Sequence, residues 1–479
     1  MQVPKANVDQ GHPNTRIAPG YALKIVAQGT DVIENPSGPI TTFGRLSDNT
    51  ATEPDQNLYL VFASNPGGPS TGFDYGRHFI FQGHENGDDL AYVTRVNLDV
   101  RDATHKVTLL TPVGSDGLTH FNSVDGSTFD PYTNTLLFTQ EDGSSGGVIQ
   151  ISSTWPAKVS TLDGIFGKGG FEGIHVDNKG DIYIAEDAGG VTVNVDPNDP
   201  NSPKVAKQPN SFLYRFLPYN IHDLSQGGKL QALQVSVNGQ PVIFHADDPS
   251  GDVFSINQLL LNTPGTSYPS QWITVHDTAV DGTDSFDANA AAKTALGTPF
   301  KRPENLAFLP GSNFATLYFS ATGDTDSLSG NVPDLAARGA WGSIFRVNTS
   351  ADGKTGSIGI FVLGDSVHNS FDNLTFADST QLLAAEDRGN TLHSELNTLD
   401  SIWSYPVGGT TSTLRFVSLG RDTTSETEGE DNEPTGVFVS SGGTHVYDLL
   451  GTPAGLVNAR GFFTMQHGDN KLYEIVQKF

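Results

Sequence analysis

Acidic residues recur in this chain at one type of place, directly before a stretch of alternating apolar residues. Each copy has an acid, then a small or amide residue, then the apolar positions. The copies begin at Asp125, Glu172, Glu304 and Asp372, and a looser fifth begins at Glu433. Oxygen ligands of this kind suit hard cations, so the repeated acids are candidates for binding metal ions.

Short apolar strands that end in a polar tip form a second repeated element. Six copies end near Glu85, Glu141, Asp187, Asp324, Asp387 and His467. Glu172 precedes Asp187 by 15 residues, as Asp372 precedes Asp387, and this spacing fits two strands and a tight turn. Such units are too small to bury their own apolar face and must stack around an axis. We therefore predict an all-β fold, a six-bladed β-propeller with inserted loops and a few short helices.

The spacing of the repeats is interrupted between about residues 191 and 300. This stretch holds a Pro- and Asp-rich loop at 196–203 and a predicted helix near 286–296. We predict one propeller domain over residues 1–479, with an insertion or cap within about 191–300. A separate small domain in that stretch is the alternative.

Corresponding positions of successive blades lie around one axis, so the repeated acids are expected to converge at the mouth of the channel. The expected ring is Glu172, Glu304, Asp372 and Glu433, with Glu85, Glu141 and Asp187 nearby. Carboxylates gather in this way only if cations compensate their charge. Ca²⁺, Mg²⁺, Mn²⁺ and ferric iron suit such ligands, whereas the 13 histidines show no paired spacing for zinc. The alternative is that these acids are solvated caps of strand ends.

Arg302 lies two residues before Glu304. Its guanidinium can pair with a carboxylate of the ring, or it can hold a phosphoryl oxygen in a forked contact. The residues alone leave both roles open.

Composition excludes several classes of function. The chain has 27 basic and 54 acidic residues, for a formal charge of −27, and this charge repels nucleic acids and anionic membranes. No cysteine is present, which excludes disulfides, thiolate metal sites and cysteine nucleophiles. We expect a small-molecule substrate and a secreted or periplasmic protein.

Taken in order, these segments resemble the PhoX-type alkaline phosphatases, which are secreted or periplasmic propeller enzymes with an iron–calcium cluster at the channel mouth. The matching pieces lie at 83–86, 139–142, 171–174, 184–187, 302–305, 371–374, 385–387, 433–436 and 463–467. The resemblance implies a phosphate contact for Arg302. It implies metal-ligand roles for Glu85, Glu172, Asp187, Glu304, Asp372 and Glu433, with Gln140 and Glu141 beside them.

One position departs from that family. The family has an iron-ligating cysteine, and Gln140 stands there in this chain. A neutral amide oxygen suits calcium better than iron, so we expect Ca²⁺ and little Fe³⁺. The prediction is a PhoX-like metal-dependent phosphoesterase that hydrolyses phosphate monoesters, with activity weakened by the missing thiolate. The alternatives are a calcium-dependent lactonase or esterase, and a non-catalytic propeller with structural calcium.

Overall fold

The computed structural model describes the chain except for residues 2, 7–13, 409–411, 421–432, 452–458 and 479. Most of its elements are short antiparallel strands that follow one another in the sequence and pair in order. The first run comprises β5 (Glu53–Val61), β6 (His78–Glu85), β7 (Tyr92–Asn97) and β8 (Val107–Leu109), extended by β3 (Val32–Ser37) and β4 (Ile40–Thr42). The second comprises β9 (Val124–Asp130), β10 (Thr135–Gln140), β11 (Val148–Ser152) and β12 (Val159–Thr161).

Two further runs are joined into one sheet by β20 (Tyr268–Asp277), which pairs with the outer strand of each. One run comprises β13 (Phe171–Val176), β14 (Ile182–Glu186), β17 (Leu213–Pro218) and β18 (Gly228–Val237), with β19 (Gln240–Pro241) at its end. The other comprises β21 (Pro303–Phe308), β22 (Thr316–Ala321), β23 (Ser343–Thr349) and β24 (Thr355–Leu363).

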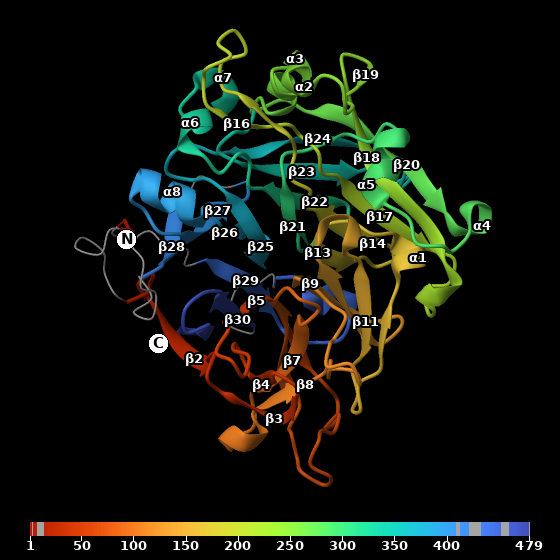
Figure 1. The fold of residues 1–479 in the computed structure, drawn as a ribbon, viewed down its shortest axis with the longest axis vertical. Helices are drawn as coiled ribbons and strands as arrows, with labels where there is room; N and C mark the ends of the chain where they lie inside the picture. The colour runs from red at the N-terminus through yellow and green to blue at the C-terminus, as the bar shows by residue number, and fades with distance from the viewer. Residues whose placement is uncertain (2, 7–13, 409–411, 421–432, 452–458, 479) are drawn as a thin grey trace.

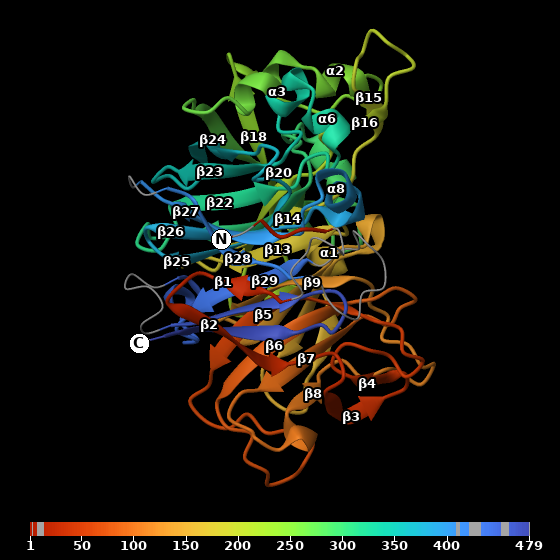
Figure 2. The same ribbon diagram turned by 90° about the vertical axis from the view of Figure 1, so that its left-hand side faces the viewer.

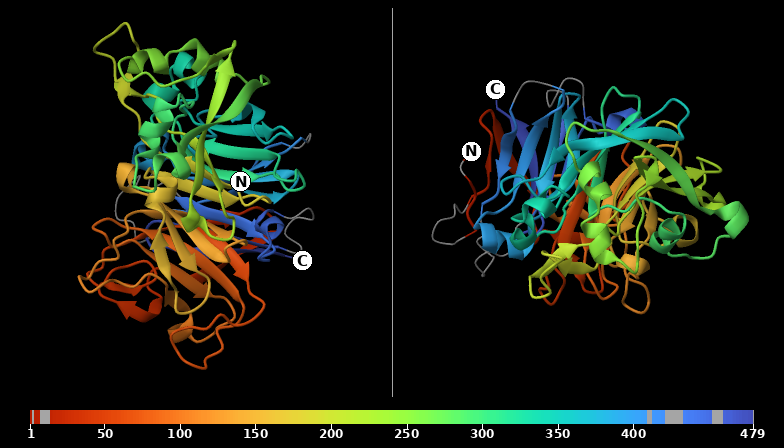
Figure 3. Two further views of the ribbon diagram at one scale, coloured as in Figure 1. Left: turned by 90° about the vertical axis from the view of Figure 1, so that its right-hand side faces the viewer. Right: turned by 90° about the horizontal axis from the view of Figure 1, so that it is seen from above.

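The last two runs are completed by strands from the N-terminal end of the chain. In one, β1 (Arg16–Ile17) pairs with the outer strand of β25 (Phe371–Asp378), β26 (Gln381–Glu386), β27 (Ser401–Pro406) and β28 (Leu414–Ser418). In the other, β2 (Tyr21–Ala27) pairs with the outer strand of β29 (Pro434–Ser440), β30 (Arg460–Met465) and β31 (Leu472–Gln477). Figure 3 shows the two ends of the chain on the same side of the molecule. These pairings tie the beginning of the chain to its end.

The first strands of these runs surround a common axis. β5, β9, β13, β21, β25 and β29 contact one another in turn, and β29 contacts β5, so the ring closes (Figure 1). The apolar core lies between neighbouring runs: Leu58 and Phe81 pack with Phe129 and Phe138 of the next run, and all four are buried. Since each run buries its faces against its neighbours, the architecture is all-β and propeller-like, as the repeats predict.

Short helices lie mainly at one end of the strands (Figure 2). α1 (Asp163–Phe166) precedes β13, α6 (Ser327–Gly330) and α7 (Pro333–Ala336) follow β22, and α8 (Gly389–Leu396) follows β26. Each innermost strand starts at the end of the molecule where these helices lie, and the second strand of each run ends there. Among the described residues, no helix is both long enough and apolar enough to span a membrane.

The stretch expected to be an insertion, 191–300, has two parts in the structure. β17, β18 and β20 belong to the central sheets. The hairpin of β15 (Thr192–Asn194) and β16 (Lys204–Lys207) and the helices α2 (Pro249–Val253), α3 (Ile256–Leu261), α4 (Thr278–Asp281) and α5 (Ala288–Thr294) lie outside them. α5 corresponds to the helix predicted near 286–296, and the Asp287 side chain caps it by accepting a hydrogen bond from the Ala290 N–H. The stretch 191–300 thus supplies strands to the joined sheet and also contains a separate two-stranded sheet, β15–β16, and the helices α2 to α5.

Candidate metal centre

Five carboxylates that line a central cavity sit at the start of an innermost strand. They are Asp55 in β5, Asp125 in β9, Glu172 in β13, Glu304 in β21 and Asp372 in β25. In each strand, the register against the second strand shifts at the acid, where two residues oppose one. Such a β-bulge re-aims a side chain at the rim of a sheet. The repeated bulge therefore turns all five carboxylates toward the same axis.

The residue after the acid allows neighbouring innermost strands to approach closely. Gly126 follows Asp125, and a Cβ at this position would lie 2.2 Å from the carbonyl oxygen of Glu172 in the next strand. The Thr139 hydroxyl of β10 donates a 2.6 Å hydrogen bond to the same carbonyl. The missing side chain and this hydrogen bond together bring Glu172 beside Asp125.

A second group of lining residues lies where the second strand of each run ends. Glu85 is the last residue of β6, and Glu141 and Asp387 directly follow β10 and β26. The backbone N–H of Glu141 donates to the Ser123 carbonyl at 2.9 Å, and that of Asp387 donates to the Ser370 carbonyl at 2.8 Å. The same closing hydrogen bond thus places both acids at the rim of the cavity.

The fifth copy of the acidic element is offset by two residues from the other four. The closing hydrogen bond of its run joins the Gln466 N–H to the Glu433 carbonyl at 2.9 Å, and the equivalent bond at Arg302 comes from the Thr322 N–H at 3.0 Å. Glu433 therefore corresponds to Arg302, and Thr435 corresponds to Glu304. Glu433 still lines the cavity, but from a position outside the bulge.

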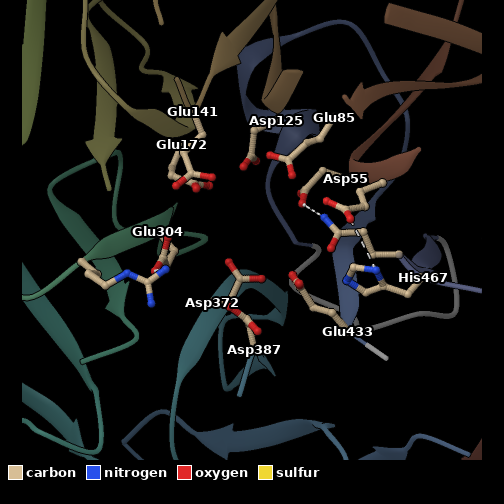
Figure 4. A pocket seen from close by; sticks show the side chains of 13 residues that line it. Asp55, Glu85, Asp125, Glu141, Glu172, Glu304, Asp372, Asp387, Glu433 and His467 are labelled. Carbon is tan, nitrogen blue, oxygen red and sulfur yellow. Dashed lines mark hydrogen bonds and ion pairs between the residues drawn. The ribbon is translucent and has the colours of Figure 1, made fainter. Parts of the chain in front are cut away.

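The cavity has a volume of about 310 Å³ and is strongly acidic. Its described lining is Glu53, Asp55, Glu85, Asp125, Glu141, Glu172, Arg302, Glu304, Asp372, Asp387, Glu433, Gln466 and His467. Figure 4 shows the carboxylates pointing inward from strands far apart in the sequence. Ten carboxyl groups face one guanidinium in this described lining, and this imbalance calls for bound cations.

Burial and mutual repulsion shift the pKa values of these carboxyls upward. Burial, followed by nearby carboxylates, raises the pKa of Glu141 to about 8. Burial likewise raises the pKa of Asp372 to about 8, and the pKa values of Asp125 and Glu172 lie well above their usual range. Without a cation, these groups would hold protons at neutral pH, and a bound cation would displace those protons.

The geometry of the acids fits metal ions on one side of the cavity. Asp55, Glu85 and Asp125 each offer an oxygen within 4.8 Å of the others, and so do Asp125, Glu141 and Glu172. Glu85 Oε1 and Asp125 Oδ1 are buried and accept no hydrogen bond from the described residues. Buried carboxylate oxygens without donors are ready ligands for a hard cation. Asp125 belongs to both groups.

Arg302 also lines the cavity. Its Nε donates to Asp187 Oδ2 at 2.6 Å, and its Nη2 lies 3.5 Å from Glu304 Oε1. Arg302 has a φ of +54°, in the left-handed region that L-residues rarely adopt. Ser123 and Ser370, which accept the same closing hydrogen bond in other runs, also have positive φ values, of +40° and +50°, and Arg302 accepts this bond from the Thr322 N–H. The strained backbone delivers the guanidinium to the cavity edge.

Most of the residues expected from the sequence meet in this cavity. Those that line it are Glu85, Glu141, Glu172, Arg302, Glu304, Asp372 and Glu433. Gln140 and Asp187 are not among the lining residues. The Gln140 side-chain oxygen accepts a 3.3 Å hydrogen bond from the Asn122 N–H. Successive residues of a strand point to opposite sides, so Glu141 faces the cavity and Gln140 faces away; the geometry gives its predicted ligand role no support.

Six further lining residues were not among the predicted ligands. They are Glu53, Asp55, Asp125, Asp387, Gln466 and His467. Asp125 and Asp387 belong to the repeated elements, so the repeats could have identified both as lining residues. Asp55 precedes a similar apolar strand, and its carboxylate accepts hydrogen bonds from Thr435 at 2.7 Å and Gln466 at 2.9 Å. These partners lie some 400 residues away, and no local signal joins them.

Solved structures with a similar fold are distant from this chain. A gluconolactonase from Xanthomonas campestris is 11% identical, with a TM-score of 0.42, and the match covers 100% of this chain and 99% of that one. A catalytically inactive virginiamycin B lyase from Staphylococcus aureus is 12% identical, with a TM-score of 0.33, covering 88% of this chain and 99% of that one. Similarity at this level carries no argument about activity. No curated protein matches the sequence.

The family comparison is more specific. The family model described as alkaline phosphatase PhoX matches residues 192–447, which is more than half of the chain. The matched segment contains Arg302, Glu304, Asp372, Asp387 and Glu433, and so supplies the cationic edge of the cavity and several of its acids. The chain belongs to the PhoX alkaline phosphatase family.

Proposed function

We propose that this protein is a metal-dependent phosphoesterase that hydrolyses phosphate monoesters in the central cavity. The observation that carries the proposal is the pairing of one guanidinium, Arg302, with a buried cluster of carboxylates at the same cavity. A phosphate ester needs cations around its oxygens, and this cavity can supply them from both sides. We also propose that the ring of innermost strands corresponds to six blades, which its closed order of contacts supports.

The carboxylates around Asp125 would hold the cations. When bound, the metal ions would neutralise the phosphate and lower the pKa of a bound water. Arg302 would donate to phosphoryl oxygens from the opposite edge, in the forked geometry that guanidinium groups favour. Calcium is the proposed metal, since the lining offers oxygen ligands and the chain has no cysteine. Burial of the lining side chains would strengthen each of these contacts.

Hydrolysis assays on the purified full chain test this proposal. p-Nitrophenyl phosphate, a lactone and a carboxylic ester would be supplied to protein as isolated, after chelation and after calcium is restored. We expect phosphate release that chelation abolishes and calcium restores. Arg302→Ala should lower kcat/KM by about 10²-fold, as for loss of a charge-stabilising donor. Arg346→Ala, on the outward side of β23, is the matched control and should keep full activity.

Other results would contradict the proposal in distinct ways. Turnover of the lactone or ester alone would identify a calcium-dependent lactonase or esterase. Bound calcium without turnover of any of the three substrates would indicate a non-catalytic propeller. Phosphatase activity that survives complete metal removal would contradict the metal-dependent mechanism.

A further inference from the structure

Asp187 differs from the acids at equivalent places because its carboxylate pairs with Arg302 and is not among the groups that line the cavity. Its N–H donates to the Gly170 carbonyl at 2.8 Å, which is the same closing bond that places Glu141 and Asp387 at the rim. Those two acids line the cavity, and Asp187 does not. Neither Asp187 nor Asp387 belongs to the two described groups of potential metal ligands, and Asp187 Oδ1 is buried and accepts no hydrogen bond from the described residues. Asp187 thus has the same backbone position as Glu141 and Asp387, but its side chain has a different partner.

That partner is Arg302, 115 residues further along the chain. Arg302 Nε donates to Asp187 Oδ2 at 2.6 Å, and the Asp187 side chain is 4% exposed. We propose that Asp187 is a positioning residue that holds Arg302 toward the substrate phosphate. This inference rests on the proposed function, because it assigns a task to the guanidinium of that same site.

The contacts of Arg302 match such a task. A guanidinium offers five N–H donors in a rigid plane. Asp187 takes the Nε edge, and the contact with Glu304 involves Nη2. Among the described residues, no hydrogen bond from Nη1 is present, and the Arg302 side chain is 20% exposed against 4% for Asp187. Asp187 therefore anchors the inner edge of the plane while the outer edge faces the cavity.

Because of the charges around Asp187 and Arg302, the direction in which phosphate affinity changes on removal of the Asp187 charge shows which role Asp187 has. Lys207 of the β15–β16 hairpin lies nearby; its ammonium donates to the Thr325 hydroxyl at 3.0 Å, and burial followed by the charge of Arg302 lowers its pKa to about 8. Removal of the Asp187 charge would make this edge more positive and, by charge alone, would strengthen phosphate binding. If Asp187 acts by orienting Arg302, phosphate binding should weaken instead. The two effects have opposite signs.

The test compares Asp187→Asn with Asp387→Asn, the same exchange at the equivalent position of another run. Metal content would be measured by elemental analysis, phosphate affinity by calorimetry on calcium-loaded protein, and kcat/KM with p-nitrophenyl phosphate. We expect Asp187→Asn to keep the wild-type metal content and to lose about 10- to 100-fold in phosphate affinity and kcat/KM. Asp387→Asn should lose metal.

A double-mutant cycle with Arg302→Ala checks that Asp187 acts through Arg302. In the Arg302→Ala background, Asp187→Asn should have no further effect on phosphate affinity. If Asp187→Asn does not fold, Asp187→Glu keeps the charge but displaces the guanidinium, and it should show the same weakened affinity with unchanged metal.

Loss of metal from Asp187→Asn, comparable to that from Asp387→Asn, would overturn the inference, as would unchanged or tighter phosphate binding. Wild-type protein that binds phosphate through Asp187 and Arg302 but turns over no ester would support the inference and contradict the proposed function. Wild-type protein that binds no phosphate would overturn both.

Discussion

Removal of metal should make the stability of this protein fall as the pH rises. In the metal-free cavity, burial raises the pKa of Asp55 to about 6 and those of Glu141 and Asp372 to about 8. In the unfolded chain these groups return to ordinary values of 3.8, 4.5 and 3.8. Between these limits the native state binds more protons than the unfolded state, so its free energy of unfolding decreases with increasing pH.

The size of the effect follows from the number of protons involved. Each carboxyl that is protonated only in the native state contributes about 1.4 kcal/mol per pH unit. Near pH 5.5 these three groups alone give roughly 4 kcal/mol per pH unit, and between pH 6.5 and 7.5, where Asp55 has ionised, two give roughly 3 kcal/mol; Asp125 and Glu172, whose pKa values lie well above their usual range, add to both slopes. For a chain of this length, 1 kcal/mol corresponds to about 1 °C in Tm. Chelated protein should therefore lose at least about 3–4 °C per pH unit.

Thermal unfolding at pH 5.5, 6.5 and 7.5, with chelator or with excess calcium, measures this slope. Calcium keeps the carboxylates ionised in the native state, so the loaded protein should show a much flatter profile and a higher Tm at pH 7.5. Glu141→Gln should reduce the slope of the chelated protein by about 1.4 kcal/mol per pH unit. A chelated protein whose Tm is constant or rises from pH 5.5 to 7.5 would refute the reasoning.

Three further predictions concern single positions. Asp125→Asn should reduce bound metal more than Glu304→Gln, because Asp125 belongs to both candidate ligand groups; elemental analysis of the two variants compares them, and equal losses would argue against a shared ligand. Gly126→Ala should destabilise the fold by about 2–4 kcal/mol, since its Cβ would collide with the Glu172 carbonyl; denaturant unfolding measures this, and Gly87→Ala, whose Cβ would meet no atom within 4 Å and whose φ, like that of Gly126, is not positive, is the matched control. The protein as isolated should contain calcium and little iron, and Gln140→Cys should not add iron, because residue 140 faces away from the cavity; a visible thiolate–iron band in that variant would contradict this geometry.

Much of the fold could be predicted from local sequence. Short apolar strands with polar ends, such as those ending at Glu85 and Asp387, recur with turn residues between them, and these signals lie in consecutive residues. The repetition of these strands at similar intervals then predicts that their acidic residues converge around one axis, because repeated units must stack to bury their apolar faces. For this reason Glu172, Glu304 and Asp372 could be assigned to one cavity before any coordinates were considered.

The tertiary structure decided which neighbours each side chain meets. Asp55 joins the cavity because the beginning of the chain closes the ring against β29 and β30, where Thr435 and Gln466 hold its carboxylate. Glu141 lines the cavity and its neighbour Gln140 does not. At the end of a strand, the pattern of apolar residues does not determine which of two adjacent side chains faces the cavity. Asp187 occupies a backbone position equivalent to that of Asp387, but Arg302 takes its carboxylate across 115 residues. Local sequence determines strands and turns, whereas packing around the axis determines the partner of each buried charge, because that partner comes from another run.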